Sequence, residues 1–451
     1  MKRPLCIALT AMMLAAALTG CGSNQTPAGT SPTAGTATPS ASSTPSQSST
    51  PEAKPVTLTM LVSGNISPDG KDIEVDIVPK YVKDAFPHIT VEVTKLPDDQ
   101  YYTTVKTKLA AGQGPDIFTL FPKTGVAGAI DMAKAGYAKD LSDMNFWDNI
   151  GEGAKNDMSY EGKPRAVAKG LDFLGIYYNK SLFEQVGLKE APKDWQSFLD
   201  ACKALKDAGI TPIATADKDS WYIQFGMYQI AANTVYPDEM NFDELVQAGT
   251  KSLSDTKWVA TLDKMKTLYD NGYIVENSLG MGSAQCAQMF IDGQAAMTFD
   301  GTWSYDALMA QGAATFERGF FPLPANDSGD IYISASTAAG YGVNAATANY
   351  DAVKTVFEYW FDGSSALFNA WVDANTSISV YKGVPLTNSL YNAVYTLYQN
   401  SGKSVYFCNQ MWPGGVADEM TAKFQEVIGG QASTQDVADA MSAKFTELWG
   451  K

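Results

Sequence analysis

The stretch FLGIYYNKSLFEQVGLKEAPKDWQSFLDACKALKDAG, residues 173–209, decides the fold class. Its first six residues form a continuous apolar and aromatic run, which is typical of a buried strand. A helix is predicted to begin after Asp194, whose carboxylate is a suitable N-cap, and to end at Gly209. Apolar residues lie at helical spacing within it: Trp195, Phe198, Leu199, Cys202 and Leu205. A buried strand followed by an amphipathic helix is the repeating unit of an α/β protein.

The same unit occurs on both sides of this stretch. Before it, three strand-like runs alternate with helical patterns: VTLTML at 56–61, ITVEV at 89–93 and DIFTLF at 116–121. After it come AAMTF at 295–299 and a final amphipathic helix ending near Leu448. This alternation predicts mainly parallel sheet. A chain of 451 residues also exceeds what one hydrophobic core usually serves, so we expect two lobes.

The charge and the reactive side chains exclude several classes of function. Lys and Arg total 33 against 49 Asp and Glu, a net charge of −16, so nucleic acid is not an expected partner. His88 is the single histidine, which rules out a His-based triad or a multi-histidine metal site. The widely spaced Cys202, Cys286 and Cys408 form no disulfide framework or CxxC site. We therefore expect no metal and no cofactor.

The N-terminus reads as a secretion signal. Residues 1–20 carry two basic residues, an apolar run too short to span a bilayer, and then small residues before Cys21. The ending Leu18-Thr19-Gly20-Cys21 resembles the bacterial lipobox, which implies that Cys21 receives diacylglycerol and becomes the new N-terminus. We expect a protein held by lipid at the outer face of the cytoplasmic membrane.

Residues 21–55 follow the signal as a low-complexity segment. They are almost entirely Ser, Thr, Pro, Ala and Gly, and no large apolar side chain is available to offset the entropy of ordering the backbone. This segment is predicted to be a disordered tether beyond the lipidated Cys21. A tether of this length suits a Gram-positive cell surface, which is our hypothesis for the location.

Several motifs occur in an order and spacing that resemble those of the family 1 extracellular solute-binding proteins of carbohydrate ABC importers. They are residues 162–221, which include the stretch quoted above, AAGQGPDIFTLF at 110–121, FIDGQAAMTFDGTW at 290–303 and FFPLP at 320–324. The resemblance implies a two-lobed periplasmic-binding-protein-like (type II) fold with an interlobe hinge and a ligand cleft. It also implies a monomeric protein that captures a mono- or oligosaccharide, passes it to the membrane permease and catalyses no reaction.

The resemblance further implies that the chain crosses between the lobes three times, near Ala166–Lys169, Phe320–Leu323 and Trp371–Asn375. The expected N-terminal lobe consists of residues 56–167 plus 321–372. The expected C-terminal lobe consists of residues 168–320 plus 373–451.

Sugar rings have apolar C–H faces, so flat aromatic side chains are the first candidates for ligand contacts. Trp303 follows the turn Asp300-Gly301-Thr302 and matches the tryptophan of the family's G-x-W turn, which stacks on sugar. Trp221 and Tyr222 match a position where maltodextrin-type binders place an aromatic platform. Trp412 resembles a tryptophan late in the chain that lines the same cleft. Core packing is the alternative for each of them.

Sugar hydroxyls also need fixed hydrogen-bonding side chains. We nominate Asp172, Asp300, Asn65 and Tyr341, each beside the end of a predicted strand. A carboxylate at a strand end can instead cap a helix or pair with an arginine, and that alternative stays open.

Two other functions remain to be weighed. One is a binding protein for a non-sugar solute such as a peptide or an oxyanion, and an oxyanion site would favour convergent arginines and helix N-termini. A secreted glycoside hydrolase would need two carboxylates about 5 to 9.5 Å apart. Incubation with oligosaccharides separates the last alternative, because a binding protein leaves the chain length of the sugar unchanged.

Overall fold

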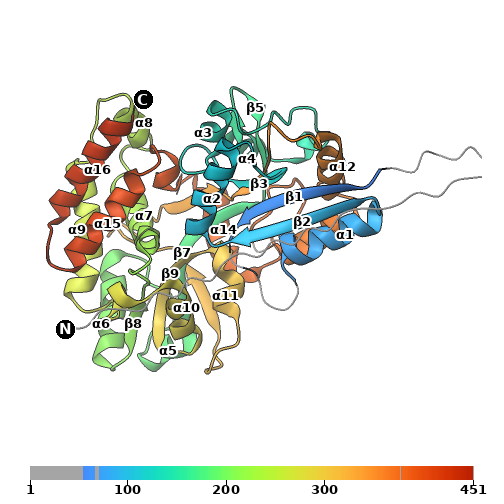
Figure 1. Cartoon of the computed structure of the whole chain (residues 1–451). Coiled ribbons are helices and arrows are strands. Elements are labelled where there is room, and N and C mark those ends of the chain that lie inside the picture. The colour runs from blue at the N-terminus through green and yellow to red at the C-terminus, as the bar shows by residue number, and fades with distance from the viewer. Residues whose placement is uncertain (1–53, 65, 67–70, 376, 450–451) are drawn as a thin grey trace, which may run out of the picture. The chain divides into compact units, whose positions relative to one another are not determined.

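The computed structural model describes residues 54–64, 66, 71–375 and 377–449, so the signal, Cys21 and most of the tether lie outside the described residues. Two β-sheets with flanking helices form two lobes, which confirms the predicted two-lobed α/β fold (Figure 1). The first lobe is built on a five-stranded sheet and the second on a six-stranded sheet.

The sheet of the first lobe has the order β2-β1-β3-β12-β6. Its strands are β1 (Val56–Ser63), β2 (Ile89–Leu96), β3 (Ile117–Leu120), β6 (Ala166–Ala168) and β12 (Gly340–Val343). β1 is parallel to both β2 and β3, as the alternating pattern predicts, whereas β12 runs antiparallel to β3 and β6. The helices of this lobe are α1 (Val78–Ala85), α2 (Asp98–Ala110), α3 (Ala129–Lys134), α4 (Glu152–Asp157), α12 (Tyr350–Trp360) and α13 (Ala366–Ala374).

The sheet of the second lobe has the order β13-β11-β7-β9-β8, and β10 also pairs with β7. Its strands are β7 (Leu171–Asn179), β8 (Thr211–Ala214), β9 (Ala295–Gly301), β10 (Arg318–Phe321), β11 (Ile333–Thr337) and β13 (Ser404–Val405). The strand β7 is antiparallel to β9, β10 and β11, so this sheet is mixed and not mainly parallel. The reason is that β7 leads away from the first lobe while β11 leads the chain back toward it.

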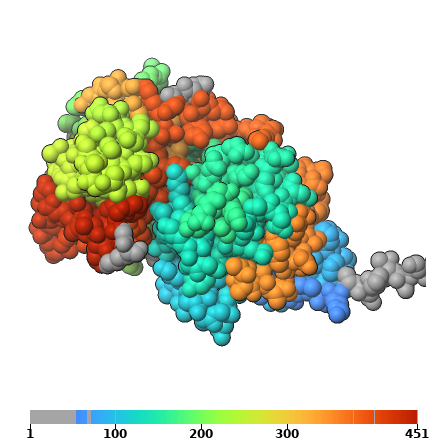
Figure 2. Space-filling view, turned by 90° about the horizontal axis from the view of Figure 1, so that it is seen from above, coloured from blue at the N-terminus to red at the C-terminus, as the bar shows by residue number. Residues whose placement is uncertain are grey.

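In the described part of the chain, ten helices belong to the second lobe. They are α5 (Lys180–Gln185), α6 (Trp195–Asp207), α7 (Ile223–Thr234), α8 (Phe242–Gln247), α9 (Thr256–Asp270), α10 (Ser283–Ile291), α11 (Tyr305–Met309), α14 (Asn392–Ser401), α15 (Val416–Ile428) and α16 (Thr434–Leu448). The C-terminal helices α15 and α16 pack together and against α9 (Figure 1). Figure 2 shows red C-terminal residues on the surface beside a yellow-green segment of the second lobe.

The predicted helix after residue 194 forms α6, with the expected cap. The carboxylate of Asp194 accepts a hydrogen bond from the Ser197 amide at 2.7 Å, and the Ser197 hydroxyl lies 3.1 Å from the Asp194 amide, completing a capping box. The face carrying Phe198, Cys202 and Leu205 is fully buried in the core of the second lobe. Periodicity and capping therefore define this helix locally.

The chain passes between the lobes at three places that lie side by side. The first crossing is residues 169–170, between β6 and β7, whereas the prediction was 166–169, of which 166–168 form β6. The amide of Lys169 donates to the Ala339 carbonyl at 3.0 Å, and the Asn375 side chain donates to the Lys169 carbonyl at 2.7 Å. A Cβ at Gly170 would lie 2.5 Å from the Ile378 carbonyl oxygen, so only glycine permits this approach.

The second crossing lies later than the sequence analysis placed it. Phe321 belongs to β10, which pairs with β7, and Leu323 is fully buried in the core of the second lobe. The chain leaves that lobe only after β11 and enters the first sheet with β12, so residues 338–339 form this crossing. The apolar pattern at 320–324 is compatible with an edge strand and with a crossing. Only its pairing with β7 shows that it is an edge strand.

The third crossing is longer than predicted. Trp371 is buried in the core of the first lobe, and Ile378 forms a bridge with Leu171 at the start of β7. Tyr381 then pairs with Ile150 of the first lobe before the chain continues into the second lobe.

Among the described helices, none combines the length and the apolar composition that spanning a bilayer requires.

Candidate ligand-binding site

A group of aromatic side chains gathers on the second lobe around the end of β9. Trp303 lies in the short turn at Thr302–Ser304 and is 37% exposed, more than any other described tryptophan except Trp449. Its ring contacts Phe225 at a centroid distance of 5.2 Å and Phe407 at 5.9 Å, both edge to face. Trp303 is thus held by two aromatic neighbours while part of its surface stays open to a ligand.

The glycine at the end of β9 allows this position of Trp303. A Cβ at Gly301 would lie 2.2 Å from two ring carbons of Trp303, so the indole rests directly over the Gly301 backbone. Gly301 has φ −108° and ψ 174°, an extended conformation that any residue can adopt. Glycine is therefore needed at position 301 because the Trp303 ring leaves no space for a side chain, and not because of the backbone conformation.

A second tryptophan extends the aromatic surface. Trp221 is half-buried in the turn before α7 and contacts Phe225 at 5.6 Å. Phe225 therefore links it to Trp303. We call the set Trp221, Phe225, Trp303 and Phe407 the aromatic platform.

Asp300 and Tyr222 lie directly behind the platform. Asp300 is 6% exposed and accepts hydrogen bonds from the Gly301 amide at 2.7 Å, the Ser304 hydroxyl at 2.6 Å and the Tyr222 hydroxyl at 3.1 Å. Burial raises the pKa of Asp300 to about 6, although these donors act in the opposite direction. Tyr222 is itself buried, so it supports Asp300 from below rather than extending the surface.

Asp172 joins the platform to the crossings. Its carboxylate accepts from the Thr302 hydroxyl at 2.8 Å and from the Ser377 hydroxyl at 3.0 Å. Thr302 precedes Trp303, and Ser377 lies in the third crossing segment. Burial raises the pKa of Asp172. The sequence analysis placed Asp172 and Asp300 in one site, and both do flank the Trp303 turn.

The platform lies where the second lobe meets the first. Burial raises the pKa of Asp306, in α11 just after the turn, and the nearby negative charge of Asp72 in the first lobe raises it further. On the other side of the platform, Tyr406 precedes Phe407 and donates a hydrogen bond to Asp157 of the first lobe. Trp303 therefore packs on Phe407, whose neighbour Tyr406 binds the first lobe.

Two nominated residues are core residues and not candidates for ligand contact. Trp412 is fully buried, and its indole N–H donates to Asp243 at 2.9 Å. Tyr341 is also fully buried; it packs on Trp360 with ring centroids 4.5 Å apart, and its hydroxyl donates to Glu74 at 2.6 Å. Both predictions were wrong because the sequence does not show how deeply a loop or strand end is covered. Asn65 lies outside the described residues.

The sequence analysis missed Phe225 and Phe407. Phe225 stands four residues after Trp221 at the start of α7, a helical spacing that brings the two rings together. Phe407 comes from the chain between β13 and α15, and its contact with Trp303 arises only in the folded protein. No local pattern marks it.

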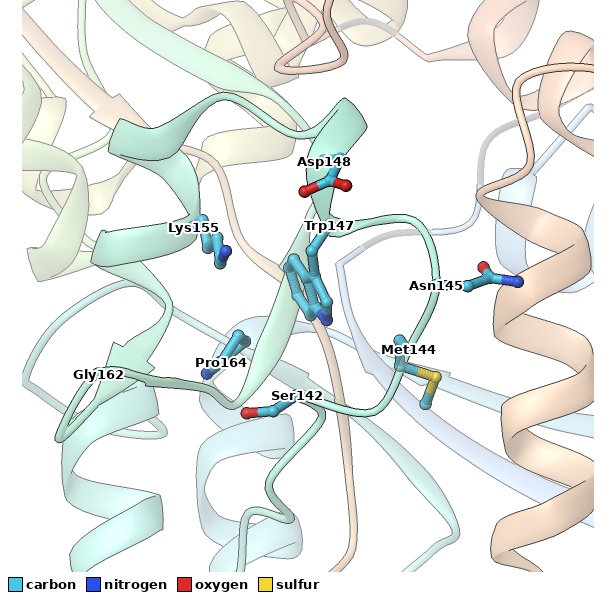
Figure 3. A pocket seen from close by; sticks show the side chains of 8 residues that line it. All are labelled: Ser142, Met144, Asn145, Trp147, Asp148, Lys155, Gly162 and Pro164. Carbon is cyan, nitrogen blue, oxygen red and sulfur yellow. The ribbon is translucent and has the colours of Figure 1, made fainter.

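A separate surface pocket of about 410 Å³ lies within the first lobe (Figure 3). All eight lining residues come from segment 142–164, and Trp147, Asp148 and Lys155 are among them. The Trp147 ring is largely buried, and its N–H already donates to the Leu141 carbonyl. The pocket therefore offers little of the aromatic surface that the platform provides.

The platform provides apolar faces and uncharged or acidic hydrogen-bonding groups. In the part of the chain that the structure describes, no group of three or more His, Cys, Asp and Glu could hold a metal ion. Cys202, Cys286 and Cys408 are buried free thiols. The arrangement suits a polar ligand with apolar faces, held by stacking and hydrogen bonds.

Comparisons with known proteins point the same way. Residues 69–362 match the model of the family described as bacterial extracellular solute-binding protein. The multiple sugar-binding protein of Streptococcus mutans is 24% identical over 301 residues, which cover 66% of this chain and 70% of that protein.

Solved structures share the fold over most of the chain. A chitin oligosaccharide binding protein is 25% identical with a TM-score of 0.76, covering 88% of this chain and 100% of its own. The substrate-binding protein RafE in complex with raffinose is 23% identical with a TM-score of 0.72, at the same coverage of both chains.

Proposed function

This chain belongs to the bacterial extracellular solute-binding protein family, and on that premise we propose that it captures a carbohydrate on its aromatic platform for an ABC importer. The solute would lie between the lobes, with Trp303 stacked on one sugar ring. Trp221 would contact a neighbouring ring. Asp300 and Asp172 would hold the Trp303 turn in place or accept hydrogen bonds from the sugar hydroxyls. Both a mono- and an oligosaccharide fit this description.

The observation that carries the proposal is the exposed Trp303 ring beside an interlobe contact, the Tyr406–Asp157 hydrogen bond. An indole held by Phe225 and Phe407 is already oriented, so a sugar ring that stacks on it orders little protein. Sugar binding by the relatives, as their names state it, supports the same class of ligand.

The arginines do not support an oxyanion as the ligand. The sequence from residue 54 onward contains two arginines, Arg165 and Arg318. Their guanidinium groups donate to the carbonyls of Ala138 and Ala310, each within its own lobe. No arginine therefore joins the aromatic platform, and a bidentate anion site has no donor there.

We also propose that the protein has no hydrolytic activity. Asp300, with a pKa of about 6, has one property of a general acid, but three donors from Gly301, Ser304 and Tyr222 already hold its carboxylate. The test is incubation with raffinose and chitin oligosaccharides followed by chromatography. Unchanged sugar lengths are expected, and release of shorter sugars would instead identify a hydrolase.

The decisive experiment is a thermal-shift and calorimetric screen against mono- and oligosaccharides, including raffinose, stachyose and chitin oligosaccharides. A ligand that binds only the native state raises the free energy of unfolding by RT ln(1 + [L]/Kd), so a saturating sugar should raise Tm. A peptide library and an oxyanion set form the comparison arms. A shift with those solutes and none with any sugar would reject the carbohydrate proposal.

The remaining parts of the proposal concern place and partners. The family is extracellular. We further propose that a lipid on Cys21 anchors the monomeric protein to the outer face of the membrane of a Gram-positive cell, where it meets the permease subunits. The lipobox-like ending at Cys21 and the tether composition support this location.

A further inference from the structure

A buried charged cluster lies in the first lobe, outside the aromatic platform. Its centre is Glu74, which is 2% exposed and lies in the π-helical turn Ile73–Ile77. The Glu74 carboxylate forms ion pairs with the ammonium groups of Lys95 at 2.9 Å and Lys169 at 2.5 Å. It also accepts a hydrogen bond from the Tyr341 hydroxyl at 2.6 Å. Lys95 also pairs with Asp72 at 2.6 Å.

Two of the three partners of Glu74 lie in or next to the segments that cross between the lobes. Lys169 is the first crossing residue, and Tyr341 follows the second crossing by two residues. The Lys169 ammonium also lies 5.0 Å from the centre of the Tyr341 ring. One carboxylate of the first lobe therefore holds both segments.

Lys169 is also where the three crossing segments meet. Its amide donates to the Ala339 carbonyl of the second segment, and its carbonyl accepts from the Asn375 side chain of the third. Its side chain is 19% exposed, and the ammonium bonds Glu74 of the first lobe. Lys169 thus bonds the other two crossing segments through its backbone and Glu74 through its side chain.

The Glu74 carboxylate is ionised in this setting. Burial alone would raise the pKa of Glu74, but Lys169 and Lys95 outweigh it and hold that pKa well below its usual range. Removing the charge leaves Lys169, whose side chain is 19% exposed, without its carboxylate partner, whereas Lys95 keeps Asp72. A charge that loses its partner in a largely buried site moves toward water, and a shift of Lys169 acts directly on the first crossing.

We propose that Glu74 is a positioning residue for ligand capture, which sets the geometry of the hinge through Lys169 and Tyr341 without touching the ligand. The proposal rests on the proposed function, because it concerns the closure of the two lobes on a solute. The aromatic platform contacts the ligand, and Glu74 determines how the first lobe closes over it.

The test compares Glu74→Gln with Asp116→Asn in the full chain. Asp116 is a matched control: it is a buried carboxylate of the first lobe that accepts from Thr59, Thr347 and Asn349, none of which lies in a crossing. Hydrogen exchange of the ligand-free proteins reports on the Lys169 and Ala338 amides, which bond across the first two crossings.

In Glu74→Gln we expect exchange at these two amides to be about tenfold faster, beyond any change in β1 to β3. Affinity for whichever of raffinose or chitin oligosaccharide the wild type binds should fall about tenfold, because fewer molecules populate the geometry that closes. Asp116→Asn should lower Tm while leaving hinge exchange and affinity as in the wild type.

Milder variants cover the case in which Glu74→Gln does not fold. Tyr341→Phe removes a single hydrogen bond and should give a smaller increase in hinge exchange, Lys169→Met should resemble Glu74→Gln, and Lys169→Arg should keep near-normal exchange. Equal exchange at the crossings in Glu74→Gln and Asp116→Asn would overturn the positioning role. Failure of every sugar to bind the wild type would count against the carbohydrate proposal alone, since exchange is measured without ligand.

Discussion

The indole of Trp303 rests over the backbone of Gly301, at a distance that leaves no room for a methyl group between them. The strand β9 thus ends in a residue without a side chain, and the following turn folds the aromatic ring back over it. Phe225 and Phe407 then fix the edges of the ring. The exposed part of the ring has the flat apolar character that a sugar ring needs for stacking.

The first prediction concerns Trp303→Ala. Because the ring is 37% exposed and already oriented, its loss should weaken sugar binding by about 2 kcal/mol, while the Tm of the ligand-free protein changes little. Calorimetric titration and ligand-free melting measure the two effects. Trp449→Ala is the control, because Trp449 is 43% exposed on the same lobe and stacks only on Phe445. Equal affinities of the two variants would reject the role of Trp303.

The second prediction concerns Gly301→Ala. The extended backbone of Gly301 accepts alanine, so the added methyl acts on the Trp303 ring alone and should displace it. Sugar affinity should fall about tenfold, and tryptophan fluorescence should change. In a Trp303→Ala background the same substitution should have no further effect on affinity. Additive losses in the double variant would contradict this explanation.

The third prediction separates Trp412 from the platform. Trp412→Ala opens a cavity in the core and leaves the buried Asp243 with one donor fewer. We expect a loss of about 3 to 5 kcal/mol in the free energy of unfolding, with near-normal sugar affinity in the folded fraction. Denaturant unfolding together with titration of the folded protein measures both. A variant with unchanged stability and reduced sugar affinity would show that Trp412 belongs to the binding site.

The fourth prediction uses the pKa of Asp300, which burial raises from 3.8 to about 6. The native state then holds the proton more tightly than the unfolded chain, so this group stabilises the fold below pH 4. That contribution is lost as the pH rises toward 6. Asp300→Asn does not titrate. Its free energy of unfolding relative to the wild type should therefore increase between pH 4 and 7, by at most about 3 kcal/mol.

A matched variant separates this titration from ligand binding. Burial also raises the pKa of Asp243 to about 6, so Asp243→Asn should show the same trend of stability with pH. Asp243 bonds Trp412 and Tyr236, neither of which belongs to the platform, so only Asp300→Asn should alter sugar affinity. A flat pH dependence of the stability difference for Asp300→Asn would show that its pKa is not raised.

The fifth prediction concerns the lipid anchor. Cys21→Ser removes the thiol that would carry diacylglycerol, so the protein should appear in the medium or the soluble fraction, with unchanged sugar affinity. Fractionation of cells expressing the wild type and the variant measures the effect. Membrane retention of Cys21→Ser equal to that of the wild type would reject lipidation at this residue.

Much of the fold could be predicted because its signals are local. The apolar run at 173–178 became part of β7, and Asp194 capped α6 as expected. The second crossing could not be placed, since Phe321 has the same local pattern in an edge strand as in a connection. Its pairing with Ile176 depends on residues about 145 positions away in the chain.

The candidate site was predicted in part for a similar reason. Trp303 follows a glycine turn after a buried strand, and that pattern placed it on the surface. Trp412 and Tyr341 also follow loops or begin strands, yet helices and neighbouring strands cover them completely. Phe407 joins the platform through a contact between residues 104 positions apart, which no local rule detects.

The crossings also determine when each lobe can fold. The first lobe needs β12 and α13, and the second needs α15 and α16, which end at Leu448. Each core therefore joins segments that lie far apart in the chain, and contacts of such large sequence separation make folding slow. Slow completion of both lobes is compatible with a protein of an extracellular family, whose chain leaves the cell before it functions.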